Sequence, residues 1–315
     1  MKQLTRKQTA DFLSQNNNYV ILTHRRPDGD TLGSSALLCR GLRKLGKSAL
    51  ILRNPEITAK YTHLHEGLTT DTVKDGDILI AVDTASAGML PQAFSAYADK
   101  ITLRIDHHAT ATSFTEAELV ESEAAACGEI VYNILKQMGG KLDEAMADAL
   151  YTAVSTDTGC FRYANTTADT LAVASECAKI SKHLFAINQA LFETRSLGRL
   201  RLEGWLIEHM LFLQDGQIAI CALPKAIEEE LGLTEDDLEN ISGFPRSIEG
   251  VKIAATIRED GENRVEISVR AVPGYDAAAI CQNFGGGGHK GAAGASMNCT
   301  MDEAVEALKA ALPKI

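Results

Sequence analysis

The sequence lacks long hydrophobic segments and any excess of basic charge. No run of 18 or more apolar residues occurs among its 315 residues, so we expect no transmembrane helix and no membrane partner. Residues 1–8 lack the apolar core of a signal peptide and predict an ordinary helix start. The formal net charge of −11 argues against binding long nucleic acid, which normally requires a basic face. A short anionic ligand remains compatible with this charge.

Paired cysteines are also absent. The seven cysteines are odd in number and form no Cys-x-x-Cys pair, which argues against a disulfide framework and a zinc–thiolate site. We therefore expect core cysteines in a cytoplasmic protein. A hydrophobic content of 45% and a charged content of 23% are typical of globular proteins, and the length suffices for two domains.

Short apolar runs alternate with helical patterns through the first 185 residues. The expected strands are Tyr19–Thr23, Ala49–Arg53, Asp77–Val82 and Ile101–Ile105, and the expected helices are Leu32–Leu45, Gly128–Met138, Asp143–Thr156 and Thr167–Lys182. This alternation predicts an α/β fold with a parallel sheet covered on both faces and with ligands at the carboxyl ends of its strands.

The pattern changes after a helical stretch in the middle of the chain. Residues Leu184–Leu213 predict one long helix or two joined ones. We expect a first domain at 1–185, a helical linker at 186–213 and a smaller α/β domain at 214–315. The strand pairs and helices expected in that smaller domain are Gln217–Ala222, Lys225–Leu231, Val251–Arg258, Arg264–Arg270 and Ala277–Phe284, with a hairpin at 260–263 and a capping box at Thr300–Glu303.

Side chains of metal-ligand type follow several of the expected strands. The triplet Asp106, His107 and His108 comes directly after Ile101–Ile105, where burying a polar group without a partner would cost roughly 2–7 kcal/mol. Imidazole suits divalent transition metals, and a neighbouring carboxylate would orient the ring. The alternative is a polar loop whose histidines face solvent.

Five further residues of this type are expected to converge with the triplet on one edge of the sheet, as a two-metal centre for phosphate chemistry. His24, Asp28 and Asp30 lie in one short motif, whose alternative is an acidic turn that caps the next helix. For Asp83 the alternative is a cap of the next helix. Its signal for a metal site is specific only if the carboxylate bridges two ions. Asp157 ends an apolar helix, where a capping role is the alternative.

A glycine run near the C-terminus is a second candidate ligand site. Gly285–Gly294 contains His289 and resembles a phosphate- or nucleotide-binding loop, in which bare amides approach an anion. A flexible linker is the poorer choice, because a segment with a packed pattern follows. Arg270 ends an expected strand, where its guanidinium is suited to a phosphate, although a surface ion pair is the alternative. Arg195 is a weaker candidate for phosphate contact.

Together these residues resemble the DHH phosphoesterase superfamily, which is named for the triplet found here at 106–108. The order of the motifs is also the family's: the His-x-x-x-Asp-x-Asp cluster, a lone aspartate, the triplet, and Asp157. The segment 286–294 is similar to the glycine–histidine signature of the DHH-associated domain. Length and layout are most similar to the branch of nano-RNases, oligoribonucleases that also dephosphorylate adenosine 3′,5′-bisphosphate.

The resemblance implies a phosphoesterase with two Mn²⁺ ions, for which Mg²⁺ or Co²⁺ are possible substitutes. It implies that one ion is held by His24, Asp28 and Asp83, and the other by Asp30, Asp83, His107 and Asp157. His108 would contact the scissile phosphate or assist the leaving group, and Asp106 would support the ligands from behind. The residues implied for substrate binding are Arg270, His289, Gly286, Gly287, Gly288 and Arg195.

The expected activity is hydrolysis of short oligoribonucleotides to mononucleotides, together with removal of the 3′-phosphate from adenosine 3′,5′-bisphosphate. One alternative is a phosphodiesterase for linear dinucleotides in cyclic-dinucleotide turnover, and another is a pyrophosphatase or exopolyphosphatase. A non-catalytic nucleotide-binding regulator is disfavoured, because all of the proposed metal ligands are present. The sequence is compatible with a homodimer and indicates no direction of chain attack.

Overall fold

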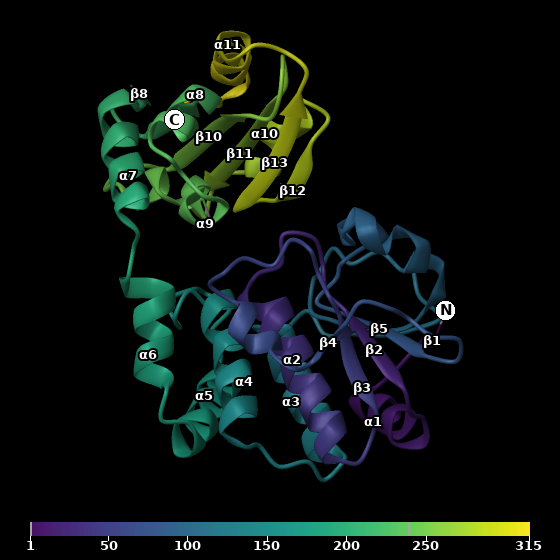
Figure 1. Cartoon of the computed structure of the whole chain (residues 1–315). Coiled ribbons are helices and arrows are strands. Elements are labelled where there is room, and N and C mark those ends of the chain that lie inside the picture. The colour runs from purple at the N-terminus through teal and green to yellow at the C-terminus, as the bar shows by residue number, and fades with distance from the viewer. Residues whose placement is uncertain (1, 239) are drawn as a thin grey trace. The chain divides into compact units, whose positions relative to one another are not determined.

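The computed structural model describes residues 2–238 and 240–315, which form two compact units that divide between Thr194 and Arg195 (Figure 1). This division lies inside the segment 186–213, where the sequence predicts a linker. Of the helices in the described part of the chain, none is long and apolar enough to cross a membrane. Five of the seven cysteines are buried, Cys160 and Cys299 are half-buried, and all seven are free.

The first unit contains a seven-stranded sheet in the order β1-β7-β6-β5-β2-β3-β4, in which every neighbouring pair is parallel. Its strands are β1 (Lys2–Gln3), β2 (Tyr19–Leu22), β3 (Ala49–Leu52), β4 (Thr69–Thr70), β5 (Ile78–Val82), β6 (Ile101–Asp106) and β7 (Ala117–Val120). The parallel α/β fold predicted from the sequence is confirmed. The order of winding reverses between β2 and β5, and ligands bind at the carboxyl ends of strands beside such a reversal.

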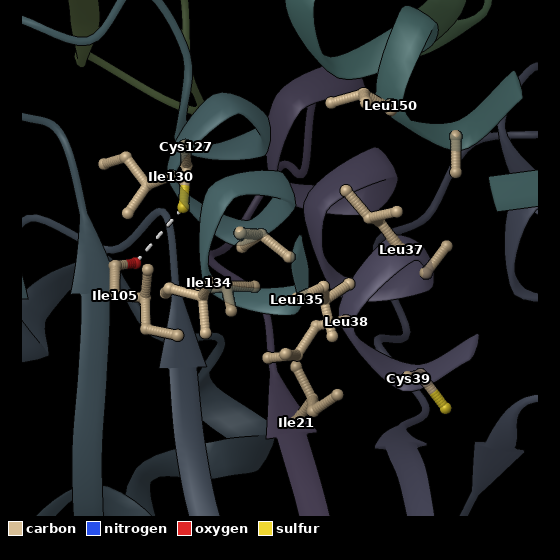
Figure 2. Packing of buried hydrophobic residues seen from close by; sticks show 14 of the residues in the cluster. Ile21, Leu37, Leu38, Cys39, Ile105, Cys127, Ile130, Ile134, Leu135 and Leu150 are labelled. Carbon is tan, nitrogen blue, oxygen red and sulfur yellow. Dashed lines mark hydrogen bonds between the residues drawn. The ribbon is translucent and has the colours of Figure 1, made fainter. Parts of the chain in front are cut away.

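Helices cover one face of this sheet. Of these, α2 (Gly29–Lys44) and α3 (Cys127–Gln137) pack on the strands, and α1 (Arg6–Gln15) packs on α3. Helix α4 (Glu144–Asp157) packs on α2 and α3, and α5 (Ala168–Ile180) and α6 (Leu184–Asn188) pack in turn on α4. Figure 2 shows Ile21 and Ile105 of the sheet packed with Leu38 of α2 and Ile134 of α3, while the Cys127 thiol lies 3.3 Å from the Ile105 carbonyl oxygen. The branched side chains of β2 and β6 thus form one continuous core with the helices.

The opposite face of the sheet is covered by 3₁₀ segments, η2 (Ala87–Met89) and η3 (Gln92–Lys100), rather than by α-helices. Phe94 of η3 packs with Val20 and Leu79 in a separate apolar cluster on this face. Both faces are therefore covered, as the alternation of strands and helices in the sequence predicts.

Helices α2 and α4 approach each other closely because glycines lie between them. A Cβ atom at Gly33 would lie 2.4 Å from the Ala149 carbonyl oxygen, and one at Gly29 would lie 2.4 Å from the Thr156 side chain. The second contact joins the start of α2 to the end of α4. It therefore brings the acidic residues around Gly29 next to Asp157.

The segment Leu184–Leu213 does not form one continuous helix. After α6 comes a π-helical turn at Gln189–Glu193, and helix α7 (Leu197–His209) begins only after a break. The last three residues, Leu211–Leu213, form strand β8 and not the end of a helix. They pair with a neighbouring antiparallel strand, and this tertiary pairing outweighs their helical propensity.

The second unit contains a six-stranded mixed sheet in the order β12-β13-β11-β10-β9-β8. Its further strands are β9 (Ile218–Leu223), β10 (Ile253–Glu259), β11 (Val265–Ala271), β12 (Gly287–His289) and β13 (Ala292–Met297), and its further helices are α8 (Lys225–Glu230), α9 (Glu235–Leu238), α10 (Ala277–Gln282) and α11 (Met301–Ala311). The capping box predicted at Thr300 and Glu303 is present and starts α11. Apolar residues of β9 alternate between two clusters, so both faces of the sheet are packed.

Candidate metal centre

Imidazole and carboxylate side chains from five segments meet at the carboxyl ends of β2, β5 and β6. The segments are the loop after β2, the start of α2, the residue after β5, the end of β6 with its following loop, and the end of α4. The groups whose ligand atoms all lie within 4.8 Å of one another are His24, Asp28 and Asp83; Asp30, His107 and Asp157; and Asp83, His107 and His108. The structure therefore brings together all six residues that the sequence proposes as metal ligands.

Asp83 belongs to two of these three groups, the first and the last. Its Oδ2 atom lies 3.5 Å from His24 Nε2, while its Oδ1 atom lies 3.4 Å from His107 Nε2. The side chain is 2% exposed, and Oδ1 has no hydrogen-bond partner in the described part of the chain. Because a buried polar atom without a partner is costly, Oδ1 is an atom that a bound cation would satisfy.

The backbone at Asp83 is unusual as well. Its φ of +54° lies in the left-handed region, which a non-glycine residue adopts only where its surroundings enforce it. Its N–H donates to the Ile105 carbonyl oxygen at 2.9 Å, which ties the residue to β6. The backbone conformation and this hydrogen bond thus fix the position of the Asp83 carboxylate.

Two histidines turn the same nitrogen toward the carboxylates. His24 Nδ1 lies 2.8 Å from the Arg25 carbonyl oxygen, and His107 Nδ1 lies 3.0 Å from the Ala124 carbonyl oxygen. Since a carbonyl can only accept, each Nδ1 carries a proton and donates it. The Nε2 atoms then face the carboxylates, and each is the atom that would bind a metal after losing its own proton.

Asp30 is 1% exposed and accepts three hydrogen bonds. Ser34 donates from Oγ at 2.8 Å, and the backbone N–H groups of Cys127 and Gly128 donate at 2.6 and 3.0 Å. Ala126, which directly precedes α3, has no side-chain oxygen with which to cap that helix. Asp30 supplies this cap from α2, where the positive end of the helix dipole stabilises its charge.

Asp106 is fully buried and holds the triplet together. It accepts hydrogen bonds from the backbone N–H groups of His107 and His108, at 2.8 and 3.3 Å, and from His108 Nδ1 at 2.8 Å. The His108 side chain is 32% exposed, and its other nitrogen, Nε2, remains for a ligand. Asp106 therefore orients a partly exposed imidazole at the edge of the cluster.

Arg104 is a functional neighbour that the sequence analysis missed. It is 1% exposed and forms an ion pair with the buried Glu118. Its Nη1 atom donates to the carbonyl oxygens of Ala85 at 2.9 Å and Thr112 at 3.1 Å, and lies 3.8 Å from Asp106 Oδ2. Arg104 thus fastens the loops that follow β5 and β6. An arginine within an apolar strand was the only signal for this role.

Negative charge is concentrated in this cluster. Burial raises the pKa of Asp157 to about 7, and the charges of Asp83 and Asp28 add to this effect while His107 opposes it. Burial, Asp83 and Asp157 also raise the pKa of Asp30 well above its ordinary value. Burial lowers the pKa of His107, but the surrounding aspartates outweigh burial and raise it to about 11. The site therefore takes up protons unless other cations supply the positive charge.

The glycine run of the second unit forms an edge strand. A Cβ atom at Gly286 would lie 2.2 Å from the Gly294 carbonyl oxygen, and one at Gly288 would lie 2.6 Å from the Ala292 carbonyl oxygen. These two glycines therefore permit the close pairing of β12 with β13. Gly287 has open space around it, so its backbone remains accessible to a ligand.

The other substrate-binding residues proposed from the sequence differ in their surroundings. His289 is exposed at the end of β12. Arg270 lies on β11 and donates from Nη1 to the Val269 carbonyl oxygen at 3.1 Å. Arg195 forms an ion pair with Glu203 at 2.7 Å, which engages it in the second unit itself.

The known proteins to which this chain is similar include phosphoesterases. The DHH family N-terminal domain matches residues 18–154, and the DHHA1 domain matches residues 215–314. The chain is 31% identical to the bifunctional oligoribonuclease and PAP phosphatase NrnA of Thermus thermophilus, over 91% of this chain and 86% of the relative. It is 26% identical to the protein of the same name from Bacillus subtilis, over 88% of each. The chain therefore belongs to the DHH family of phosphoesterases, which confirms the resemblance inferred from the sequence.

Solved structures support the same fold. An exopolyphosphatase-related protein from Bacteroides fragilis aligns with a TM-score of 0.82 and 25% identity, over 97% of this chain and 94% of that one. Exonuclease RecJ bound to manganese aligns with a TM-score of 0.50 and 12% identity, over 99% of this chain and 94% of that one. The second likeness concerns the fold alone.

Proposed function

We propose that this chain hydrolyses short oligoribonucleotides to mononucleotides and removes the 3′-phosphate from adenosine 3′,5′-bisphosphate. The observation that carries the proposal is the pair of ligand groups that share Asp83, with one carboxylate oxygen directed to each group. The relatives from Thermus thermophilus and Bacillus subtilis carry both activities in their names.

The proposal includes two divalent ions, with Mn²⁺ preferred and Mg²⁺ or Co²⁺ as substitutes. One would be held by His24, Asp28 and Asp83, and the other by Asp30, Asp83, His107 and Asp157. The residues fit such ions, because Asp83 Oδ1 is buried without a described partner and two imidazole Nε2 atoms face the carboxylates. Oxygen and imidazole ligands without thiolate suit these metals. When bound, a pair of such ions lowers the pKa of water and offsets charge on a phosphate.

His108 is proposed to contact the scissile phosphate or to give a proton to the leaving oxygen. Asp106 holds its Nδ1 at 2.8 Å, so the imidazole presents Nε2 in a fixed direction. Arg104 in turn supports Asp106 and the loops on either side of it. The chain thereby orients its proposed proton donor without relying on the metal ligands alone.

In the second unit, Arg270 and His289 are proposed to hold the phosphate or nucleotide of the substrate, with the backbone of Gly286, Gly287 and Gly288. The exposure of His289 and the open space at Gly287 support this assignment. Arg195 contributes less in this proposal, because Glu203 already neutralises it.

The direct test is turnover by the purified chain in Mn²⁺. We expect mononucleotides from end-labelled RNA of about two to five nucleotides and free phosphate from adenosine 3′,5′-bisphosphate, with both activities lost in EDTA. A variant with Asp106→Ala and His107→Ala should lose both. Faster hydrolysis of pyrophosphate or polyphosphate than of RNA would contradict the proposal, and tight nucleotide binding without turnover would indicate a regulator.

A second arm of the test concerns substrate length. The net charge of −11 opposes binding of a long polyanion, so rates should fall as the RNA is lengthened. Comparable rates on short and long RNA would refute the preference for short substrates.

A further inference from the structure

The loop that follows Asp157 has an uncommon backbone. Gly159, Cys160 and Phe161 all adopt left-handed φ angles, of 56°, 58° and 63°. Residues other than glycine avoid this region because the side chain crowds the backbone. Consecutive left-handed residues persist only where the surroundings enforce them, and they cluster at functional sites.

Several contacts hold this loop in its conformation. The Cys160 N–H donates to the Ser155 carbonyl oxygen at 2.6 Å, and the Phe161 ring packs 5.8 Å from that of Tyr151. Asn165 donates from Nδ2 to the carbonyl oxygens of Asp157 and Ala125, each at 3.1 Å. The loop is thus tied both to the last turn of α4 and to the segment before α3.

The loop presents Tyr163 to solvent. A Cβ atom at Gly159 would lie 2.3 Å from Tyr163 Cζ and 2.5 and 2.6 Å from Cε1 and Cε2, so the ring rests on the glycine backbone. Tyr163 as a residue is nevertheless 52% exposed and belongs to none of the hydrophobic clusters in the described part of the chain. The ring is therefore supported from one side and open from the other, without a role in the core.

Arg162 precedes Tyr163 in the chain and contacts the same glycine. Its Nε atom donates to the Gly159 carbonyl oxygen at 2.6 Å, which holds the guanidinium, and within residues 2–238 and 240–315 it takes part in no ion pair. Gly159 is two residues from Asp157, a chain separation of at most about 7 Å. A supported aromatic ring and an unneutralised cation thus both contact Gly159, two residues along the chain from the proposed metal ligand Asp157.

We propose that Tyr163 is a stacking surface for a nucleobase next to the scissile phosphate, and that Arg162 binds a phosphate of the same substrate. This inference rests on the proposed function. Aromatic rings stack on any base, and the planar guanidinium donates two hydrogen bonds to phosphate oxygens. The ring and the cation are neighbours in this loop, as a base and a phosphate are in a nucleotide. Neither residue was among those proposed from the sequence.

The test compares Tyr163→Ala and Tyr163→Phe with the unaltered chain. The substrates are an adenine dinucleotide and two analogues in which one or the other base is removed and the sugar kept. Tyr163→Ala should raise KM for the dinucleotide about tenfold with kcat little changed, because stacking contributes to binding. Tyr163→Phe should restore KM, since it keeps the ring. For the analogue that lacks the stacked base, Tyr163→Ala should make no difference.

Arg162→Met supplies the matched control, because every substrate in the series carries a phosphate. It should raise KM for the dinucleotide and for both analogues alike. An unchanged KM in Tyr163→Ala would overturn the proposal. An equal rise on both base-free analogues would also overturn it, because the residue would then support the loop and not a base.

A binding measurement separates this inference from the proposed function. Calorimetry of adenosine 5′-monophosphate binding needs no turnover, so it remains informative if the unaltered chain cleaves no RNA. A Kd about tenfold weaker in Tyr163→Ala, with Tyr163→Phe unchanged and thermal unfolding preserved, supports the stacking surface. Equal Kd values in all three proteins would refute it.

Discussion

In the first unit several of the proposed metal ligands are buried and hydrogen-bonded, whereas in the second unit His289, proposed to bind phosphate, is exposed on an edge strand and Arg270 is half-buried on β11. Asp83 and Asp106 are almost inaccessible to solvent, and each is held by several backbone or side-chain contacts. His289, by contrast, is exposed on β12. The first unit therefore fixes its groups in advance, and the second offers groups that can adapt to a ligand.

This difference has a physical basis. A metal centre requires its ligands within a few tenths of an ångström of their final positions. Buried ion pairs and a strained backbone hold them there. A surface that binds a phosphate or a nucleotide tolerates more movement. Substitutions of the buried groups in the first unit should consequently affect catalysis and stability, and those of exposed groups that bind substrate should affect affinity.

The largest effect is expected from Asp83→Ala. Loss of the shared carboxylate removes one oxygen from each ligand group, so kcat for short RNA should fall by at least about 10³-fold. The number of Mn²⁺ ions bound, measured by calorimetry, should fall as well. Asp75→Ala changes an exposed aspartate of the same unit and should leave both quantities unchanged. Full activity in Asp83→Ala would show that the preorganised carboxylate of the first unit is not required for catalysis.

Arg104→Met should be the most destabilising of these changes. It leaves Glu118 and Asp106 buried without their cation, and breaking a buried ion pair costs about 3–5 kcal/mol in the free energy of unfolding. Urea unfolding would measure this loss. Replacing Glu118 with Met in the same chain should restore part of the stability, because the stranded carboxylate is then gone. A loss below about 1 kcal/mol would show that the network does not hold the first unit's loops.

Acid should weaken the first unit through His65. Burial lowers the pKa of His65 to about 4, below the value near 6.5 of the unfolded chain. The unfolded state therefore binds the proton more tightly, and stability declines as the pH falls from about 6.5 toward 4. Between pH 7 and pH 5 this group should cost about 2 kcal/mol.

The measurement is urea unfolding at both pH values for the unaltered chain and for His65→Gln. The variant should lose less stability on acidification, by about 2 kcal/mol. His63→Gln alters an exposed histidine two residues away and should keep the slope of the unaltered chain. Parallel slopes in all three proteins would contradict the assignment to His65.

The smallest effect is expected in the second unit. His289→Ala should raise KM for adenosine 3′,5′-bisphosphate about tenfold, the loss of one hydrogen bond to a charged group, with kcat nearly unchanged. The free energy of unfolding and the Mn²⁺ content should not change. If kcat fell instead of KM rising, His289 would belong with the preorganised groups, and the contrast between the units would not hold.

Much of the fold could be predicted because its signals are local. The apolar runs of β2, β5 and β6 predict strands, and the alternation with helices predicts their parallel order. Parallel strands end at one edge of a sheet. The imidazole and carboxylate groups that directly follow β2, β5 and β6 could therefore be expected to meet there, and the structure brings them together.

Other features could not be predicted, because they depend on partners far apart in the sequence. Asp30 caps α3 through Cys127, 97 residues away, and no pattern around either residue indicates that bond. Strand β8 was expected to be helical, and only its pairing with β9 made it extended. The left-handed turn at Gly159–Phe161 likewise exists because contacts with α4 and the segment before α3 enforce it.

The sequence by itself determined which groups lie at the strand ends and which chemistry they are suited to, because residue type and strand position are local properties. Only the tertiary structure decided how those groups are held: the ion pair of Arg104 with Glu118, the two directions of the Asp83 oxygens, and the support of Tyr163. The reason is that a buried polar or strained group is stable only with its partners in place, and folding alone brings those partners together.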